Sequence, residues 1–400
     1  MTAYKLDNTV KHYAWGSPDL IPRLLGRENP EREPWAELWM GTHSEGPSTT
    51  VLEGKTVALS ELVELPFLLK FLAAETPLSI QAHPDLNQAR EGFERENKAG
   101  IAPSDPKRNY KDPSHKPEIL CALGPFTAMA GFREPAETAA FLEQLEGAGA
   151  LHAALDGGYG KFLSLLFALS KEERAALSAA VFRAGERAAL SVKERASAGA
   201  PGAARPEEAW RLCGEFARLY PGDPGILSPL YLNMLELEPL DAIFIRAGLF
   251  HAYVRGFGVE CMANSDNVLR GGLTPKHVDL EELFRVLSFE PCKPAVLKPV
   301  LLSGNADAGC YGYKTACGEF SLFLLRGTGG RAAELKAPGG AVAVVYEGTV
   351  TIPPDITLRP GESAYISRRT PGESLVFRSP EEGGFTLFAA VIPEDPAPRA

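Results

Sequence analysis

Short apolar runs separated by turns fill most of residues 1–133 and the chain beyond residue 235. Such runs, bounded by glycine, proline and polar residues, predict short β-strands. Between residues 134 and 220, alanine, leucine, glutamate and arginine dominate, and the apolar residues recur at helical spacing. The pattern therefore predicts a mainly β protein with a helical insertion.

Within the helical region, Ser170-Lys-Glu-Glu173 has the form of a capping box, which opens a helix. Residues 199–206 interrupt the pattern before a further helix over residues 207–219. A shorter helix is expected at residues 86–96. Residues 97–115 follow it as a polar, basic stretch punctuated by proline, which is typical of a lid or a pocket rim.

From about residue 292 onward, nearly all of the chain is predicted to be strand and turn. The expected strands cover residues 320–325, 341–346, 350–352, 362–366 and 385–392. Short, evenly spaced strands indicate a sandwich or jelly roll. No histidine lies beyond His277, so this C-terminal unit lacks the ligands for an imidazole metal site of its own.

Length and composition narrow the class of protein. A chain of 400 residues exceeds what one core usually holds, so two or three units are expected. The net charge of −10 argues against nucleic acid and anionic membranes as partners, and no apolar run approaches the length of a membrane span. The six scattered cysteines and the lack of a signal-peptide pattern predict reduced thiols in a cytoplasmic protein.

The stretch Thr76–Pro84 carries the first candidate chemistry. It alternates small and apolar residues as a strand does, and a strand would place Ser79, Gln81 and His83 on one face. An amide oxygen beside an imidazole supplies half of a metal site. Taken alone, a core histidine with satisfied hydrogen bonds is the commoner explanation, so the other ligands must come from elsewhere.

A second candidate is Lys116-Pro117-Glu118. Proline biases the residue before it to an extended conformation, so Lys116 and Glu118 should project to the same side. On most surfaces such a pair is only a salt bridge, and this alternative is about as frequent as a functional one.

His251, just past the expected strand that Gly248 ends, is the third candidate. A jelly roll can present a ligand at this position to the mouth of its barrel. The combined ligand candidates are Gln81, His83, Glu118 and His251. Two imidazoles, a carboxylate and an amide oxygen suit zinc or a similar divalent ion, with room left for water or substrate.

The fourth candidate is the stretch Glu260–Lys276. Asp266 is by default a turn residue and Arg270 a surface charge. However, an arginine followed by two glycines allows an anion to approach both guanidinium and backbone. Glu260 follows His251 by nine residues, so a hairpin is expected to return it to the same mouth.

Together these motifs resemble the type I mannose-6-phosphate isomerases. The resemblance covers the chain from the N-terminus to about residue 290, with a weaker β-rich tail. It rests on motifs in the right order: Tyr13-Ala-Trp-Gly16, Trp39-Met-Gly-Thr-His43, Ile80-Gln-Ala-His-Pro84, His115-Lys-Pro-Glu118, His251-Ala-Tyr253 and Glu260–Lys276. Several motifs in order make this a specific match.

The resemblance implies two cupin-type jelly rolls plus an α-helical domain. The catalytic jelly roll would comprise residues 1–133 and 225–291, the helical insertion residues 134–224, and the C-terminal cupin residues 292–400. It also implies one zinc ion per chain, with Arg270 as a catalytic residue. The implied zinc ligands are Gln81, His83, Glu118 and His251.

The expected reaction interconverts mannose 6-phosphate and fructose 6-phosphate by moving a proton between C1 and C2 through an enediolate. Glu260 is the candidate base, and Lys116 or His83 could assist ring opening. The candidate substrate contacts are Trp15, which could stack on a sugar ring, together with Lys70, Ser79, Tyr253, Asp266 and Lys276. The expected partner is a small phosphosugar, and the chain is expected to be a monomer or weak homo-oligomer.

Two other classes compete with this interpretation. One is a non-catalytic sugar-binding, regulatory or seed-storage type of bicupin, and the other is an iron-dependent cupin oxygenase. The amide ligand and the surrounding lysines and arginine favour a phosphosugar over dioxygen. A pure binding module has no need for both Glu260 and Arg270 beside a metal.

Overall fold

A ten-stranded antiparallel sheet forms the centre of the molecule. The computed structural model describes residues 2–197, 205–337, 339–367 and 374–393. The main path of the sheet runs in the order β10-β9-β12-β6-β3-β2, while β7, β8, β11 and β13 pair beside it. These strands are β2 (Thr9–Lys11), β3 (Glu37–Gly41), β6 (Phe67–Ala74), β7 (Gln81–Ala82), β8 (Glu118–Ala122), β9 (Phe126–Phe132), β10 (Leu232–Leu237), β11 (Ala242–Ile245), β12 (His251–Ala263) and β13 (Leu269–Arg270).

The C-terminal residues form a seven-stranded sheet and a four-stranded sheet. The seven-stranded sheet has the order β1 (Ala3–Leu6), β21 (Ser363–Ile366), β18 (Ala341–Gly348), β23 (Gly384–Val391), β16 (Ser321–Thr328), β15 (Ala308–Gly312) and β14 (Val300–Gly304). The four-stranded sheet has the order β17 (Ala332–Lys336), β22 (Ser374–Arg378), β19 (Val350–Ile352) and β20 (Ile356–Leu358). All five strands expected in this region are present.

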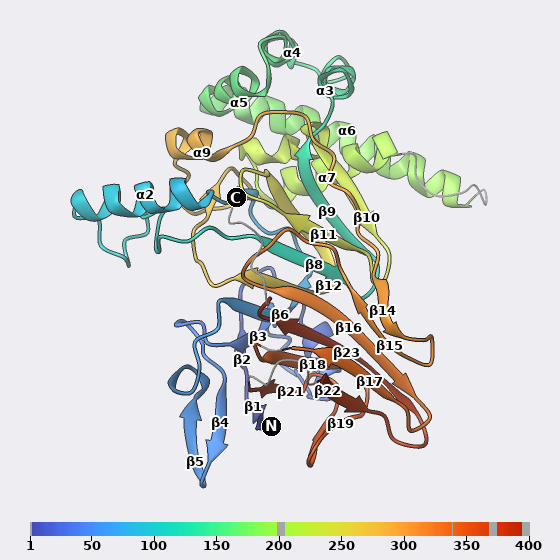
Figure 1. The fold of residues 1–400 in the computed structure, drawn as a ribbon. Coiled ribbons are helices and arrows are strands. Elements are labelled where there is room, and N and C mark those ends of the chain that lie inside the picture. The colour runs from blue at the N-terminus through green and yellow to red at the C-terminus, as the bar shows by residue number, and fades with distance from the viewer. Residues whose placement is uncertain (1, 198–204, 338, 368–373, 394–400) are drawn as a thin grey trace.

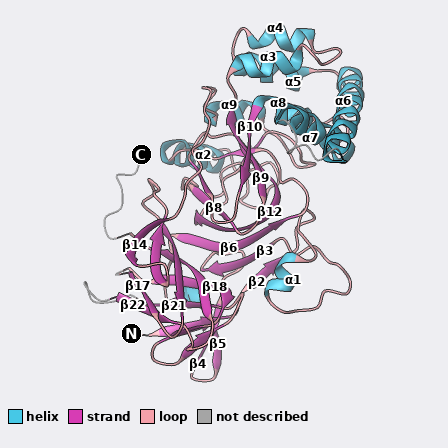
Figure 2. Cartoon of the chain, turned by 90° about the vertical axis from the view of Figure 1, so that its right-hand side faces the viewer, coloured by secondary structure: helices cyan, strands magenta, loops and turns pink. Residues whose placement is uncertain are grey.

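The N-terminal strand crosses the expected division of the chain. Residues 3–6 were expected in the first unit, but β1 pairs with β21, with Ala3 opposite Ile366. A hairpin of β4 (Thr49–Leu52) and β5 (Lys55–Ala58) projects at the end of the molecule near the N-terminus (Figures 1 and 2). The first residues of the chain therefore complete the C-terminal sheet.

Apolar side chains from the two large sheets share one core. Phe67, Phe71 and Val259 from the central sheet lie in the same buried cluster as Val342 and Phe388 from the C-terminal sheet. Figure 1 shows the C-terminal strands directly against the region of β3 and β6. The C-terminal unit thus buries one side of the sheet that positions the site.

The helices gather at the far end of β9 and β10 (Figures 1 and 2). They are α3 (Pro135–Leu142), α4 (Gly149–Leu155), α5 (Tyr159–Ala168), α6 (Lys171–Ser197), α7 (Arg205–Leu219), the short 3-10 helix η2 (Pro224–Leu227) and α8 (Ser228–Tyr231). The predicted capping box is confirmed, because the amide of Glu173 donates to Ser170 Oγ and the amide of Ser170 donates to Glu173 Oε2. Most of the predicted break at residues 199–206 lies outside the described residues, and helical structure continues to Tyr231 rather than ending at residue 224.

The remaining helices are short or peripheral. They are α1 (Leu20–Leu24), the 3-10 helix η1 (Leu59–Glu61), α2 (Leu86–Lys98) and α9 (Leu280–Val286). The predicted helix at residues 86–96 is confirmed by α2, which Asp85 caps by accepting from the amide of Gln88. None of the helices in the described part of the chain is long and apolar enough to cross a membrane. All six cysteines are free thiols, as expected.

Two local predictions were wrong. The expected strand Thr76–Pro84 forms a regular ladder only over Gln81–Ala82, although the amides of Leu78 and Ile80 also donate to the carbonyl oxygens of Tyr253 and Gly272. Pro77 and Pro84 have no amide hydrogen to donate and limit the ladder at either end. No hairpin separates His251 from Glu260, because β12 runs unbroken from His251 to Ala263. His251 therefore follows β11, as expected, and also opens a long strand of its own.

Candidate active site

Three of the predicted metal ligands meet in the core of the central sheet. His83 Nε2 lies 3.3 Å from Glu118 Oε1, and His251 Nε2 lies 3.6 Å from Glu118 Oε2. His83 follows β7, Glu118 opens β8 and His251 opens β12. All three side chains are buried, and the atoms that could bind a metal lie within 4.8 Å of one another.

Hydrogen bonds to the backbone set the direction of both imidazoles. His83 Nδ1 lies 2.8 Å from the carbonyl oxygen of Asn267, and His251 Nδ1 lies 2.9 Å from that of Leu249. A carbonyl oxygen can only accept, so each Nδ1 carries the hydrogen and each Nε2 keeps a free lone pair. Burial lowers the pKa of His83 to about 4, which keeps its ring neutral as metal binding requires.

Three atoms of this cluster are buried without a hydrogen-bond partner: His83 Nε2, Glu118 Oε2 and His251 Nε2. Leaving such groups unsatisfied in a core costs about 1–3 kcal/mol each. Burial raises the pKa of Glu118, but the charge of Lys116 and the contacts with His83 and His251 outweigh it and hold the pKa well below its usual range. Two neutral imidazoles and one carboxylate converging in this way fit a divalent metal ion.

Gln81, the fourth predicted ligand, lies beside the cluster. It stands opposite His251 in the pairing of β7 with β12 and opposite Arg270 in the pairing of β7 with β13. Its side chain lines a cavity of about 150 Å³ that Glu118 also lines. The structure therefore joins the metal-ligand cluster to an open space for a small molecule.

The walls of this cavity are strongly polar. Of the predicted site residues, it is lined by Lys70, Gln81, Lys116, Glu118, Tyr253, Glu260 and Asp266. The other lining residues are Tyr13, Glu37, Trp39, Glu45, Leu72, Leu78 and Met262. Lysines and carboxylates thus face one another around the space beside the metal-ligand cluster.

Strand pairing explains why these side chains share a face. Lys70 on β6 stands opposite Glu260 on β12 and opposite Trp39 on β3. Side chains directly opposite each other in a ladder point to the same face of the sheet. Glu37 lies two residues before Trp39 on β3, so its side chain points to this face as well. The register of three neighbouring strands therefore builds one wall of the cavity.

A bulge in β12 brings both ends of the strand to the site. His251 and Glu260 are nine residues apart, an odd spacing that points side chains to opposite faces of a regular strand. The pairing with β9 shifts register between Tyr253 and Arg255, and Gly256 has a φ of 137°. This irregularity reverses the alternation, so that His251 and Glu260 serve the same site.

Two buried lysines are paired with carboxylates. Lys116 Nζ lies 2.9 Å from Glu118 Oε1, which confirms that these two side chains project to the same side. Lys70 Nζ lies 2.6 Å from Glu260 Oε2 and 3.0 Å from Glu37 Oε1. Burial raises the pKa of Glu260, and the negative charges of Glu118 and Glu37 raise it further. The positive charge of Lys70 lowers the pKa but does not outweigh them, so the pKa of Glu260 is raised overall.

Basic residues gather beside the cavity. Arg270 is half-buried and, within the described ranges, its side chain has no hydrogen-bond or ion-pair partner. Burial lowers the pKa of Arg270. Lys276 is exposed overall, but part of its side chain is buried. This partial burial and the positive charges of Arg270 and Lys111 lower its pKa. Positive charges crowded in this way can receive an anion.

Three predicted substrate contacts, Trp15, Ser79 and Lys276, do not line the cavity, and neither does Arg270. Trp15 packs, partly buried, against the cluster that includes Tyr253, and its ring stacks on Tyr13 at 5.7 Å. Ser79 is partly exposed. Tyr13 faces the cavity in place of Trp15, and burial with the charge of Glu37 raises its pKa to about 12.

Sequence reasoning missed four polar or aromatic lining residues: Tyr13, Glu37, Trp39 and Glu45. Tyr13 and Trp39 occur in the motifs quoted above, but neither was predicted as a site residue. Glu37 could have been found as a site residue, because it is a glutamate inside the apolar segment Ala36–Gly41. A charge in such a segment is costly unless it has a partner. Asp266 lines the cavity as predicted, and its Oδ1 lies 3.4 Å from His43 Nε2.

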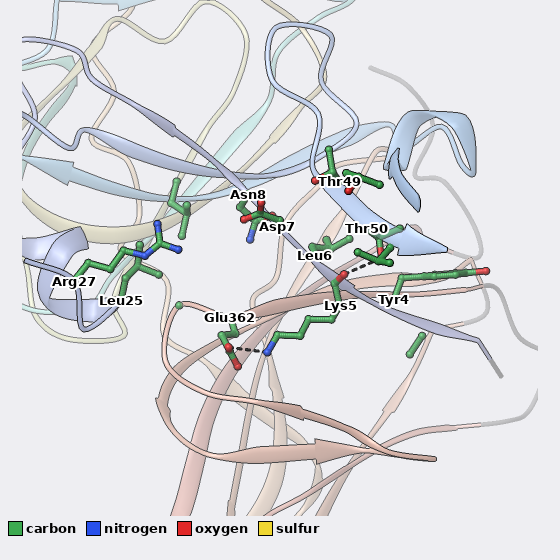
Figure 3. A pocket seen from close by; sticks show the side chains of 15 residues that line it. Tyr4, Lys5, Leu6, Asp7, Asn8, Leu25, Arg27, Thr49, Thr50 and Glu362 are labelled. Atoms are coloured by element: carbon green, nitrogen blue, oxygen red, sulfur yellow. Dashed lines mark hydrogen bonds and ion pairs between the residues drawn. The ribbon is translucent and has the colours of Figure 1, made fainter. Parts of the chain in front are cut away.

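A larger hollow, of about 500 Å³, lies where β1, β4 and the turn before β21 meet (Figure 3). None of the predicted site residues lines it. Lys5 Nζ lies 2.7 Å from Glu362 Oε1, and Thr50 Oγ1 donates to the carbonyl oxygen of Lys5 at 2.8 Å. Unlike the cavity beside the metal-ligand cluster, this hollow is lined by none of His83, Glu118 and His251.

Comparisons with known proteins identify the family of the chain. Residues 3–135 match the family model for the catalytic domain of type I phosphomannose isomerase. The chain is 37% identical over 391 residues to the mannose-6-phosphate isomerase of Salmonella typhimurium, covering 90% of this chain and 94% of that one. It is 34% identical over 327 residues to the human mannose-6-phosphate isomerase, covering 72% and 73% of the two chains.

Solved structures give the same result. A crystal structure of zinc-bound mannose 6-phosphate isomerase matches with a TM-score of 0.83 and 34% identity, covering 98% of this chain and 100% of that one. A glutamate-to-alanine variant of phosphomannose isomerase from Salmonella typhimurium matches with a TM-score of 0.84 and 33% identity over the same shares of the two chains. The chain belongs to the type I mannose-6-phosphate isomerases, also called phosphomannose isomerases.

Proposed function

We propose that the chain is a zinc-dependent enzyme that interconverts mannose 6-phosphate and fructose 6-phosphate. The observation that carries this proposal is the convergence of three unpartnered buried atoms, from His83, Glu118 and His251, beside a small cavity lined by lysines and carboxylates. The names of the relatives support the substrate, and a zinc-bound neighbour supports the metal.

In this proposal, His83, Glu118 and His251 hold the zinc ion, with Gln81 as the fourth ligand. A set of two imidazoles and oxygen ligands is typical of zinc sites that leave a position for substrate. Bound zinc supplies positive charge that polarises the sugar oxygens. The other catalytic functions fall to residues around the cavity.

Glu260 is the proposed base that moves the proton between C1 and C2, so that the reaction passes through an enediolate. It lines the cavity, and burial raises its pKa towards the range where a carboxyl group both accepts and returns a proton. Lys116 is the proposed group for ring opening. It lines the cavity, whereas both nitrogens of His83 are committed to the backbone and to the metal-ligand cluster.

Positive charge has two proposed roles. Arg270 would stabilise negative charge that develops on the substrate, and Lys70 and Lys276 would bind the phosphosugar. The position of Lys111 near Lys276 supports an additional contact to the phosphate. Tyr253 and Asp266 would contact the sugar within the cavity. Trp15 and Ser79 would contact a part of the substrate that extends beyond the cavity.

We also propose the finer architecture: two cupin-type jelly rolls joined by a helical domain. The catalytic jelly roll would comprise residues 1–133 and 225–291, apart from the N-terminal strand. The helical insertion would comprise residues 134–224, and the second jelly roll residues 292–400. The separate antiparallel sheets and the clustered helices support this division. The free cysteines support a cytoplasmic enzyme, which we propose to be a monomer or weak homo-oligomer.

The test is a coupled assay that measures formation of fructose 6-phosphate from mannose 6-phosphate. We expect a chelator to abolish turnover and Zn²⁺ to restore it, because metal charge is central to the proposed reaction. His251→Ala should lose both bound zinc, measured by elemental analysis, and activity. His152→Ala, which changes a partly exposed histidine on α4, is the matched control and should retain both.

Two outcomes would contradict the proposal. Full turnover by protein shown to contain no metal would exclude a catalytic zinc ion. Wild-type protein that carries zinc and binds the phosphosugar without converting it would instead indicate a non-catalytic binding module.

A further inference from the structure

Lys70 is a buried ammonium group shared by two carboxylates. Its Nζ lies 2.6 Å from Glu260 Oε2 and 3.0 Å from Glu37 Oε1. The three residues stand on neighbouring strands, β6, β12 and β3, and all three side chains are buried. Burial lowers the pKa of Lys70, but the charges of Glu260 and Glu37 outweigh it and raise the pKa, so Lys70 stays protonated.

The second carboxylate oxygen of Glu37 also has a hydrogen-bond partner. Trp39 Nε1 donates to Glu37 Oε2 at 2.7 Å, so both carboxylate oxygens of Glu37 have a partner. The Trp39 ring packs edge-on against His43, with 4.9 Å between the ring centroids, and Lys11 Nζ lies 4.2 Å from the Trp39 centroid. A carboxylate that is engaged in this way is better suited to hold a cation than to abstract a proton.

Glu260 depends on this arrangement for its own orientation. Within the described residues, Lys70 is the one cation at ion-pair distance from Glu260. A lysine side chain has several rotatable bonds, and a contact to Glu260 alone would leave the pair free to shift together. The second contact, to Glu37, fixes the ammonium group at one point of the cavity wall.

We propose that Glu37 is a positioning residue of the isomerisation site, which fixes the ammonium group of Lys70 and thereby holds Glu260 where it transfers the proton. The inference rests on the proposed isomerase activity and assigns a role beyond it. Glu37 acts through Lys70 and needs no contact with the reacting carbons. When Glu37 is replaced, Lys70 keeps its charge and its place in the cavity wall beside Glu260. The loss of Glu37 should therefore affect the chemical step, which depends on the exact position of Glu260, more than substrate binding.

The test compares Glu37→Gln with the wild type in the same isomerase assay. We expect kcat to fall about 10- to 100-fold, because a slightly misplaced catalytic group costs about that much. KM should change less than about threefold, zinc content should stay the same, and Glu37→Asp, which keeps the charge, should recover part of kcat. Glu53→Gln, which changes an exposed glutamate in the turn between β4 and β5, is the matched control and should behave as wild type.

A double-mutant cycle with Lys70→Met shows whether Glu37 acts through Lys70. If it does, Glu37→Gln should lower kcat little or not at all in the Lys70→Met background. Equal losses in both backgrounds would overturn the inference, as would a Glu37→Gln enzyme with wild-type kcat. If Glu37→Gln does not fold, Trp39→Phe frees one oxygen of Glu37 and must show the same loss in kcat. An unchanged kcat in that variant would also overturn the inference, whereas an inactive wild type would contradict the proposed function itself.

Discussion

Arg270 is the charged residue whose surroundings most favour a bound anion. It is half-buried, is followed by two glycines and, within the described part of the chain, has no carboxylate partner. An uncompensated guanidinium in such a place destabilises the folded protein unless it binds something negative. This placement is consistent with binding of the phosphosugar by Arg270. The contacts of Arg270 give it no role in stabilising the fold.

We expect the Arg270→Ala variant to fold and to keep its zinc. Its kcat/KM should fall about 10³-fold, because the variant lacks a group that stabilises negative charge in the transition state. Steady-state kinetics with mannose 6-phosphate, zinc analysis and thermal melting measure the three quantities. Arg246→Ala, at an exposed arginine, is the control and should match the wild type. A value of kcat/KM within a few-fold of wild type would make Arg270 an ordinary surface charge.

Glu260 is the second residue with a specific prediction. Glu260→Gln keeps the size of the side chain but cannot accept a proton, so turnover should fall about 10²–10⁴-fold. Zinc and the phosphosugar should still bind, because the metal-ligand cluster is separate from Glu260. In D₂O the wild type should place deuterium at C1 or C2 of the sugar, and the variant almost none.

The matched control for this variant is Glu238→Gln, at an exposed glutamate after β10. Exchange and turnover at wild-type rates in Glu260→Gln would move the base elsewhere. Lys116 would then be the next residue to test, since it lines the same cavity.

At the scale of elements, a contact between the two large units also carries a prediction. His115 Nε2 lies 2.7 Å from Glu319 Oε1, which joins the residues before β8 to those before β16. Cys317 Sγ lies 3.3 Å from Glu319 Oε2. Burial raises the pKa of Glu319, but the contacts with His115 and Cys317 outweigh it and lower the pKa from 4.5 to about 2.

Because the pKa is lower in the folded state, this contact stabilises the protein above about pH 4.5 and its contribution is lost as the pH falls towards 2. Glu319→Gln should lower the free energy of unfolding at pH 7 by about 1–3 kcal/mol and should lower the melting temperature accordingly. Wild type and variant should converge as the pH falls below 4.5. A difference in melting temperature that stays constant from pH 7 to pH 3 would show that the charge of Glu319 contributes nothing.

The sequence predicted elements better than it predicted their irregularities. Periodicity was sufficient for β16, for β18 and for the helix opened by Ser170, because each depends on the local pattern of apolar residues. The bulge that brings His251 and Glu260 together depends on pairing with β9, which no local pattern reveals. For the same reason the partnership of Glu37 with Lys70 could not be read from the chain, since their contact follows from strand register.

For the whole molecule, the shared core makes the C-terminal unit a condition for folding of the catalytic one. Large side chains of the central region that pack in this core include Leu38, Phe67, Phe71 and Val259. Exposing four such side chains costs about 6–12 kcal/mol, which is comparable with the entire stability of a typical domain, about 5–15 kcal/mol. The pairing of β1 with β21 would be lost as well.

Removal of residues 296–400 should therefore leave a chain that is insoluble or lacks a cooperative melting transition, although it keeps Gln81, His83, Glu118 and His251. Phe320→Ala and Phe388→Ala are milder changes in the same core. Each should keep zinc and activity at 25 °C while lowering stability by about 3–5 kcal/mol, measured by thermal melting. A truncated protein that is monodisperse, binds zinc and melts at the wild-type temperature would show that the catalytic unit folds alone. The tail would then need a function other than support of the site.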